Sequence, residues 1–370
     1  MIPPRWLLAP QEFKGTLSAA EAADAMAEGL RQASLDVVLD VAPLADGGPG
    51  TLDALLAGSK GERRRLTVRG PMGTPVEACW ARLDDGRTAV VEMAQASGIA
   101  LVPPEQRDAR AACTHGTGEL MRAALDSGCE RLIVGLGGSA TTDGGKGALE
   151  ALGFRFLDAD GAPLPPGGAS LARLSRVDAS GKHPRLEQVE LLIATDVTAP
   201  LLGNDGAARL FGPQKGADAA AVEELEAALA TFCRIVDEGP ANLPGAGAAG
   251  GLGYGLAALG GGKLTSGYVL VARALGLDRR VLLADLVLTG EGRFDRQTSM
   301  GKGPVALARL AQAQGTQVVL FAGVVQRDNK PELSLFREVV ELSAQARPGA
   351  TARETLREAT TKWALAHLGR

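Results

Sequence analysis

Residues 36–58, DVVLDVAPLADGGPGTLDALLAG, decide the fold class. A β-branched apolar run ends in a polar loop rich in glycine, and a stretch with helical spacing follows it. The preceding segment has the same plan, because RWLLAP (5–10) is typical of a buried strand and residues 13–33 are typical of a helix. Two successive strand–loop–helix units predict a parallel sheet covered by helices, an α/β fold. Ser18 and Glu21 have capping-box spacing, so the first helix is expected to begin near Ala19.

The pattern changes near residue 61 and returns near residue 280. Residues 62–94 alternate apolar and polar side chains, and Asp85-Gly86 is a hairpin signal, so antiparallel strands are expected there. From about 280, short apolar strands and a helix alternate again. We therefore predict two domains: a discontinuous flavodoxin-like (Rossmann-like) parallel-sheet domain, 1–60 plus 281–370, and an inserted mixed α/β domain, 61–280.

Composition excludes several classes of function. The chain has 370 residues, more than one core comfortably holds, and a net charge of −4 with no long basic run, which disfavours nucleic acid as a partner. The uncharged stretch 239–262 is dominated by Gly and Ala, too weakly apolar to predict a membrane span. Four scattered cysteines lack CxxC spacing, so neither a zinc site nor a disulfide framework is indicated and a cytoplasmic setting is expected.

The loop 136–145, LGGSATTDGG, carries the strongest chemical signal. It lies between a predicted strand and a predicted helix, where glycines let backbone N–H groups approach an anion such as phosphate. Asp143 beside such a cradle suggests a bridging cation such as Mg²⁺. The alternative is a tight turn in which Ser139, Thr141 or Asp143 caps the following helix.

Other polar residues follow predicted strands, where ligands bind in open parallel sheets. Carboxylates and lysines together suit metal-assisted phosphoryl transfer, in which one aspartate accepts a proton from the attacking hydroxyl. A turn, a helix cap, a structural ion pair or a solvated side chain is the alternative at each position. The set comprises Lys14, Asp46, Asp196, Glu291, Arg293 and Asp295, with Lys215 and Lys302 in other glycine-containing loops.

Taken in order, these segments resemble the bacterial glycerate kinase family that makes 2-phosphoglycerate. The resemblance covers nearly the whole chain. It runs through APQEFKGTLSAAEAA, PLADGGPGTLDAL, VEMAQASGIALV, THGTGELMRAALDSGC, VGLGGSATTDGGKGALEALGFRFLDADG, ATDVTAPLLGNDGAARLFGPQKGA, LPGAGAAGGLGYGL and DLVLTGEGRFDRQTSMGKGPVALARLA.

The resemblance implies ATP-dependent phosphorylation of D-glycerate with Mg²⁺, in the cleft between two α/β domains, by a monomer or homodimer. It implies catalytic roles for Asp196, Lys14, Asp46 and Asp295. Nucleotide binding falls to Gly137, Gly138, Ser139, Thr141, Asp143 and Lys215, and substrate binding to Arg293, Gln297 and Lys302. Metal binding falls to Asp143, Asp196 and Glu291.

The chain also departs from the family pattern. Gln11 replaces the aspartate of the usual DSFKG, Pro49 replaces the glutamate of ADGGEGT, Arg296 replaces a glycine, and Gly303 replaces a hydroxyl residue. These changes leave two alternatives open. One is a kinase for another small hydroxy acid or for the 3-hydroxyl of glycerate. The other is a non-catalytic sensor that binds nucleotide or glycerate.

Overall fold

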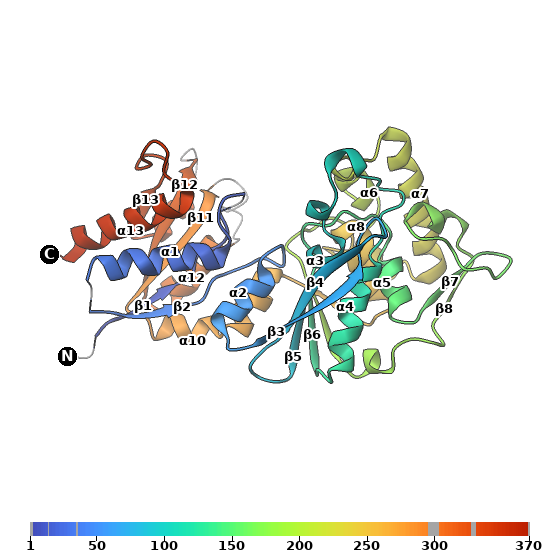
Figure 1. The fold of residues 1–370 in the computed structure, drawn as a ribbon, viewed down its shortest axis with the longest axis horizontal. Coiled ribbons are helices and arrows are strands. Elements are labelled where there is room, and N and C mark those ends of the chain that lie inside the picture. The colour runs from blue at the N-terminus through green and yellow to red at the C-terminus, as the bar shows by residue number, and fades with distance from the viewer. Residues whose placement is uncertain (1–2, 14, 35, 295–302, 327–330, 369–370) are drawn as a thin grey trace. The chain divides into compact units, whose positions relative to one another are not determined.

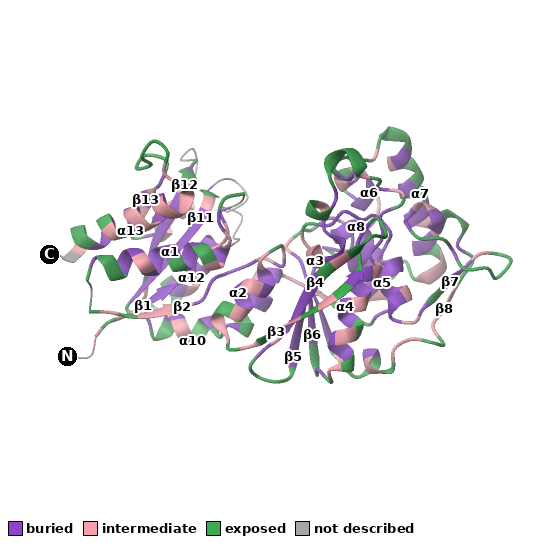
Figure 2. Ribbon diagram, viewed as in Figure 1, coloured by how far each residue is buried: buried purple, intermediate pink, exposed green. Residues whose placement is uncertain are grey.

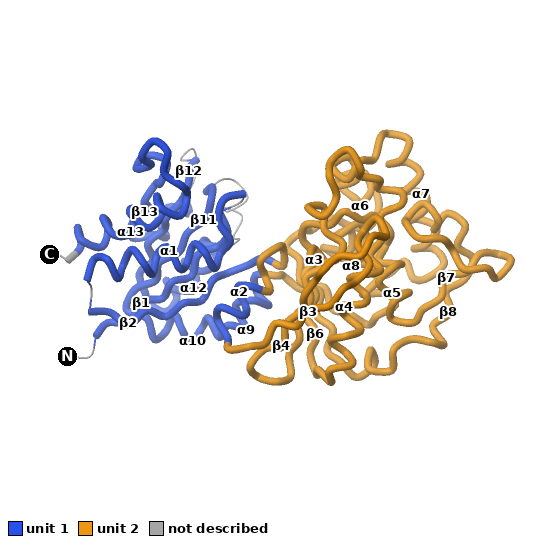
Figure 3. Tube along the Cα trace, in the orientation of Figure 1, with its two compact units in different colours: residues 1–46, 53–59, 268–370 blue, residues 47–52, 60–267 orange. Residues whose placement is uncertain are grey.

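The computed structural model describes residues 3–13, 15–34, 36–294, 303–326 and 331–368, and its fold class is α/β (Figure 1). The chain divides into two compact units (Figure 3). Unit 1 comprises residues 1–46, 53–59 and 268–370, and unit 2 comprises residues 47–52 and 60–267. The domain boundaries expected from the sequence, 1–60 plus 281–370 and 61–280, remain a prediction.

The described strands of unit 1 form one parallel sheet in the order β13-β12-β11-β1-β2. Counted along the chain within this unit, that order is 2-1-3-4-5, the flavodoxin-like arrangement. The strands are β1 (Arg5–Leu8), β2 (Val38–Val41), β11 (Leu286–Phe294), β12 (Gln317–Val325) and β13 (Glu338–Glu341), and the helices are α1 (Ala19–Gln32), α2 (Thr51–Gly58), α9 (Gly267–Ala274), α10 (Leu277–Leu282), α12 (Pro304–Ala313) and α13 (Ala352–Leu368).

Helices α1 and α13 pack against each other over the core of unit 1. Ser18 caps α1 through the expected capping box, with Glu21 N–H donating to Ser18 Oγ at 3.2 Å. A Cβ on Gly29 would lie 2.5 Å from the Arg357 carbonyl oxygen, so this glycine lets α1 and α13 approach closely. Trp363 of α13 is 5% exposed and packs in one cluster with Met26 and Phe321.

Unit 2 contains a mixed sheet in the order β10-β9-β6-β5-β4-β3. The strands β5, β6, β9 and β10 are parallel, and the hairpin predicted around Asp85-Gly86 joins the antiparallel β4 and β5. Its elements are β3 (Glu62–Arg69), β4 (Pro75–Arg82), β5 (Thr88–Glu92), α3 (Ala94–Ser97), α4 (His115–Asp126), β6 (Arg131–Gly135), α5 (Lys146–Ala151), β7 (Arg155–Leu157), β8 (Arg176–Asp178), β9 (Glu190–Ala194), α6 (Ala207–Phe211), α7 (Ala219–Val236), α8 (Ala248–Ala258) and β10 (Lys263–Thr265).

Burial follows the predicted pattern in unit 2 (Figure 2). The strands β5 and β6 are almost wholly buried, and α7 buries one face, as its amphipathic spacing predicts. The Gly/Ala-rich stretch 239–262 forms a loop and the short, closely packed helix α8. In the described part of the chain no helix combines the length and the apolar character needed to cross a bilayer.

Candidate active site

The carboxyl ends of β5, β6 and β9 bring four loops of unit 2 together. Their parallel alignment places the residues after each strand at one edge of the sheet. Backbone hydrogen bonds join the loops there: Leu136 N–H donates to Ala194 O at 3.1 Å, and Gly137 N–H donates to Gly47 O at 3.1 Å. The segment that follows β5 joins through Ala140 N–H, which donates to Ser97 O at 2.9 Å.

The first glycine pair of loop 136–145 packs against residues 47–49. A Cβ on Gly137 would lie 2.3 Å from Gly48 Cα, and one on Gly138 would lie 2.9 Å from Pro49 Cγ. Because the Gly137 N–H already donates to the Gly47 carbonyl, this glycine serves the close approach of two loops. Ser139 is 8% exposed and lies beside this contact in the chain.

Asp143 is a fully buried acceptor at the start of two helices. Its Oδ2 accepts hydrogen bonds from Thr114 N–H (2.8 Å), Thr114 Oγ1 (2.8 Å) and Gly147 N–H (3.2 Å), and its Oδ1 accepts one from Gly145 N–H (3.1 Å). Thr114 precedes α4, Gly145 precedes α5 and Gly147 is the second residue of α5, so one carboxylate binds backbone N–H groups beside the starts of both helices. The bond from Gly147 N–H is of the kind that the capping alternative expects, and the nucleotide and metal roles of Asp143 stay predictions.

Lys215 is buried beneath the same loop. It ends the 3₁₀ turn η5 (Pro213–Lys215), is 2% exposed, and donates from Nζ to the Thr141 carbonyl oxygen at 2.6 Å. Burial lowers the pKa of its ammonium group to about 7, although the nearby Asp143 charge opposes that shift. The buried Oγ1 atoms of Thr141 and Thr142 have no hydrogen-bond partner among the described residues.

Asp196 follows β9 and lies half-buried at the carboxyl edge. Ser266 Oγ donates to Asp196 Oδ1 at 2.8 Å, which fixes the orientation of the carboxylate. The loop after β9 is held by Thr195, whose Oγ1 accepts a hydrogen bond from Val197 N–H at 3.2 Å. An oriented carboxylate at this edge can accept a proton or bind a cation.

Glu92 is a residue that the sequence analysis missed. It ends β5, is 2% exposed, and accepts hydrogen bonds from Thr51 N–H at 2.7 Å and Leu52 N–H at 3.4 Å. Gln95 Nε2 donates to its other oxygen at 3.1 Å. Glu92 thus fixes the loop that begins at Gly47. The sequence signal that could have identified Glu92 is a carboxylate at the end of an apolar run, because a buried carboxylate needs hydrogen-bond partners.

Unit 1 has its own carboxyl edge. Gln11 and Asp46 follow β1 and β2 there, and Glu291 lies within β11, three residues before its end. The sequence placed Glu291 and Arg293 in a loop, but β11 continues to Phe294 and pairs Arg293 with Val324 of β12. Glu291 is 8% exposed, Asp46 is half-buried, and Arg293 is exposed. The predicted site residues Lys14, Asp295, Gln297 and Lys302 lie outside the described residues.

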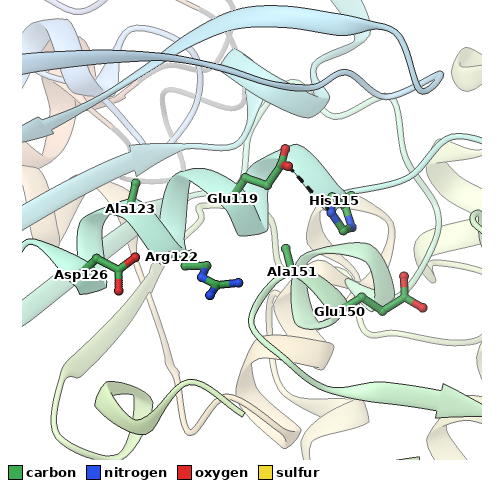
Figure 4. A pocket seen from close by; sticks show the side chains of 7 residues that line it. All are labelled: His115, Glu119, Arg122, Ala123, Asp126, Glu150 and Ala151. Atoms are coloured by element: carbon green, nitrogen blue, oxygen red, sulfur yellow. Dashed lines mark ion pairs between the residues drawn. The ribbon is translucent and has the colours of Figure 1, made fainter. Parts of the chain in front are cut away.

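An open pocket of about 430 Å³ lies between α4 and α5 (Figure 4). His115 Nε2 is 3.9 Å from Glu119 Oε1, and burial lowers the pKa of the His115 imidazole, so the ring is neutral near pH 7. Burial raises the pKa of Glu150, against the effect of Lys146 Nζ at 3.0 Å. The pocket holds both charge signs and offers no coordination geometry for a metal ion.

We next consider whether the side chains of the described residues could bind a divalent cation. Across residues 3–13, 15–34, 36–294, 303–326 and 331–368, no three His, Cys, Asp or Glu side chains group closely enough to hold a metal ion. The Asp143 oxygens already accept four protein hydrogen bonds. Asp196 and Glu291, predicted metal ligands, carry the hard carboxylate oxygens that Mg²⁺ prefers, but they belong to different compact units, so their metal roles stay predictions.

Comparisons with known proteins agree along the whole chain. The sequence model of the Glycerate kinase family matches residues 6–366. The chain is 45% identical to the glycerate kinase of Halalkalibacterium halodurans, over 86% of this chain and 84% of that protein. It is 43% identical to the glycerate 2-kinase of Escherichia coli, over 87% and 86%. A crystal structure from Salmonella typhimurium, provisionally assigned as glycerate kinase 2, superposes with a TM-score of 0.88 at 38% identity and covers 99% of both chains.

Proposed function

The chain belongs to the glycerate kinase family, and on that premise we propose that it transfers the γ-phosphoryl group of ATP to the 2-hydroxyl of D-glycerate. The observation that carries the proposal is the family match over residues 6–366, together with identities above 40% to named glycerate kinases. The products are ADP and 2-phosphoglycerate. The small-molecule acceptor suits a chain without a basic surface run.

We assign to Asp196 the role of the general base that accepts the proton of the glycerate hydroxyl. The glycerate hydroxyl oxygen forms a bond to the γ-phosphorus, the bond from phosphorus to the ADP oxygen breaks, and Asp196 accepts the hydroxyl proton. Ser266 supports this role because its hydroxyl donates to Asp196 Oδ1 at 2.8 Å and orients the carboxylate. Asp46 and Asp295 remain further candidates for a catalytic role.

Loop 136–145 is proposed to shape the phosphate site. Its Ser139 and Thr141 side chains and the Gly138 backbone are the groups we assign to the nucleotide, while Gly137 packs the loop. Two buried residues hold the loop in place. Asp143 binds the Thr114 and Gly145 N–H groups beside the starts of α4 and α5, and Lys215 donates to the Thr141 carbonyl oxygen. Lys14, Arg293, Gln297 and Lys302 stay assigned to the glycerate carboxylate or the transferred phosphate.

Mg²⁺, when bound, would neutralise charge on the phosphate oxygens. Asp196 and Glu291 are each a candidate carboxylate ligand for it. Asp143 is moved from the metal set to the support of the loop, because four hydrogen bonds, three of them on Oδ2, already hold the buried carboxylate in place.

The proposal is tested by coupling ADP formation to an NADH-linked assay with ATP, Mg²⁺ and D-glycerate. We expect ADP formation that depends on D-glycerate and falls to background when D-glycerate is left out. Folded protein that releases no ADP above the D-glycerate-free control would refute the kinase assignment.

A further inference from the structure

Helix α8 contains a left-handed turn, residues 249–251, near its start. Ala249 has φ 54° and ψ 38°, Gly250 has φ 65° and ψ 35°, and Gly251 has φ 89° and ψ 5°. Glycine adopts such angles freely, but an alanine there brings its Cβ close to the following carbonyl oxygen. In the described part of the chain, only Ala249 and Ser34 combine a side chain with a positive φ. Ser34 is exposed, whereas Ala249 is 7% exposed, so the strain at Ala249 lies in the core of unit 2.

The left-handed turn packs on loop 136–145. Gly144 N–H donates to the Gly250 carbonyl oxygen at 3.0 Å. A Cβ on Gly250 would lie 2.0 Å from the Thr141 carbonyl oxygen. Both contacts join backbone atoms, so a side-chain movement cannot relieve either of them. The backbone angles of the turn therefore aim the Gly250 carbonyl at Gly144 and let the two segments meet.

Lys215 binds the carbonyl group that faces Gly250. Its Nζ donates to the Thr141 carbonyl oxygen at 2.6 Å, and the lysine is 2% exposed. The hydroxyls of Thr141 and Thr142 are buried and have no hydrogen-bond partner among the described residues. The contacts of the Thr141 backbone with the turn and with Lys215 therefore fix this part of the loop. The two hydroxyls stay available to a polar ligand, which accounts for their lack of a partner.

The Cβ of Ala249 restricts the angles that the turn can adopt. A residue with a side chain has one small left-handed region, and Ala249 lies in it, whereas glycine adopts a broad range of positive φ. The Ala249 methyl group packs in the core cluster of unit 2, which holds the residue in this region. Strained residues persist where their surroundings hold them, and they cluster at active and ligand-binding sites. The strain at Ala249 therefore points to a functional demand on the turn.

We propose that Ala249 is a positioning residue for ATP, which acts through the left-handed turn and Thr141 of loop 136–145. The proposal rests on the proposed function, because it takes this loop to be the phosphate site. With the turn fixed, Thr141 stays where its hydroxyl can meet a phosphate oxygen. With glycine at position 249, the turn and the loop sample further conformations, and ATP binds to a smaller fraction of the molecules.

Direct binding of ATP tests the positioning role. Ala249→Gly removes the methyl group but relieves the strain, so its Tm should stay within about 3 °C of that of the unmodified chain. We expect isothermal titration calorimetry with ATP and Mg²⁺, without D-glycerate, to give a Kd at least about threefold higher for this variant. A change in Kd at constant Tm is not expected from a residue that only packs the core. An unchanged Kd would overturn the proposal.

Two further variants are matched controls. Ser34→Gly makes the same kind of change at the other strained residue, which follows α1 in unit 1, and it should leave the Kd for ATP unchanged. Ala249→Ser keeps a Cβ at position 249, so it should retain the affinity of the unmodified chain. An equal rise in Kd for Ser34→Gly and Ala249→Gly would overturn the proposal. An equal rise for Ala249→Ser and Ala249→Gly would also overturn it, because the Cβ would then not be what matters.

Hydrogen exchange tests the contact without nucleotide. Ala249→Gly should speed exchange in peptides that cover Gly144, because the Gly250 carbonyl that accepts its N–H is then less well fixed. Ser34→Gly should not change exchange there. Unchanged exchange at Gly144 in Ala249→Gly would overturn the link between the turn and the loop.

The measurements separate this proposal from the proposed function. If the unmodified chain binds no ATP and shows no D-glycerate-dependent turnover, the kinase assignment fails and the positioning proposal fails with it. Hydrogen exchange still reports the contact between the turn and the loop in that case. If the unmodified chain binds ATP and turns over D-glycerate, and Ala249→Gly has the same Kd, the kinase assignment stands and Ala249 has no positioning role.

Discussion

Replacing Asp143 by asparagine should destabilise unit 2 strongly. The best placement of the asparagine amide puts its oxygen at the position of Oδ2, where the Thr114 N–H, the Thr114 hydroxyl and the Gly147 N–H converge. The NH₂ group then faces the Gly145 N–H. Three charge-assisted hydrogen bonds then weaken by about 1 kcal/mol each, and one buried N–H loses its acceptor, at about 1–3 kcal/mol. Removing a buried charge offsets part of this loss, so we expect a net cost of about 3 kcal/mol.

The assay is thermal unfolding combined with hydrogen exchange. A cost of about 3 kcal/mol corresponds to a Tm decrease of about 6–12 °C for a unit of this size. Amide hydrogens should exchange faster in peptides that cover the starts of α4 and α5. Exchange in β1 and α1 should be unchanged, because the hydrogen bonds of Asp143 lie in unit 2. Asp158→Asn is the matched control, since Asp158 accepts two backbone hydrogen bonds in an exposed turn, and it should shift Tm by less than about 2 °C.

A clear result would refute the reasoning on Asp143. If Asp143→Asn shifts Tm no more than Asp158→Asn does, the buried carboxylate is not the support that its hydrogen bonds indicate. If Tm is unchanged and the Mg²⁺ concentration for half-maximal activity rises at least about tenfold, Asp143 is a cation ligand and our reassignment is wrong.

Three further predictions follow from the site. Because burial lowers the Lys215 pKa to about 7, the unfolded chain binds more protons than the folded chain between about pH 7 and 10, so stability should rise with pH across that window. Denaturation at pH 6, 7.5 and 9 should show this slope and its loss in Lys215→Met, and an unchanged slope would contradict the shift. In urea unfolding, Gly250→Ala should lower the free energy of unfolding by at least about 2 kcal/mol more than Gly261→Ala. Both glycines have positive φ, but only at Gly250 would the added Cβ lie 2.0 Å from a carbonyl oxygen. Equal losses would count against the packing argument. Asp196→Asn should lower kcat at least about a hundredfold and Ser266→Ala by about tenfold, and near-normal turnover in the first variant would remove this carboxylate from the mechanism.

Local patterns in the sequence predicted much of the fold. The capping box at Ser18 and Glu21 set the start of α1, and Asp85-Gly86 set the β4–β5 hairpin, because each depends on neighbours within a few residues. The flavodoxin-like sheet followed from repeated strand–loop–helix units on both sides of an insertion.

Features that depend on distant contacts could not be predicted in the same way. The sequence predicts that Glu291 and Arg293 follow a strand, yet pairing with β12 extends β11 to Phe294. The backbone donors that Glu92 binds, Thr51 and Leu52, lie about forty residues earlier in the chain, so no local pattern indicated that it holds their loop.

The glycines of α8 show the same limit on sequence-based prediction. The sequence predicted close packing for 239–262 but not its partner. Gly250 accepts a hydrogen bond from Gly144 N–H at 3.0 Å, and a Cβ on Gly251 would lie 3.0 Å from Gly144 Cα. The glycine-rich segment therefore forms a support for loop 136–145, and only the tertiary structure shows which loop it contacts.

The most direct test of the central claim is ³¹P NMR of the purified chain with ATP, Mg²⁺ and D-glycerate. We expect one new phosphomonoester signal that matches 2-phosphoglycerate and grows as the γ-phosphate signal of ATP declines. A signal that matches 3-phosphoglycerate would contradict transfer to the 2-hydroxyl, and no new signal from folded protein would contradict the proposed kinase activity.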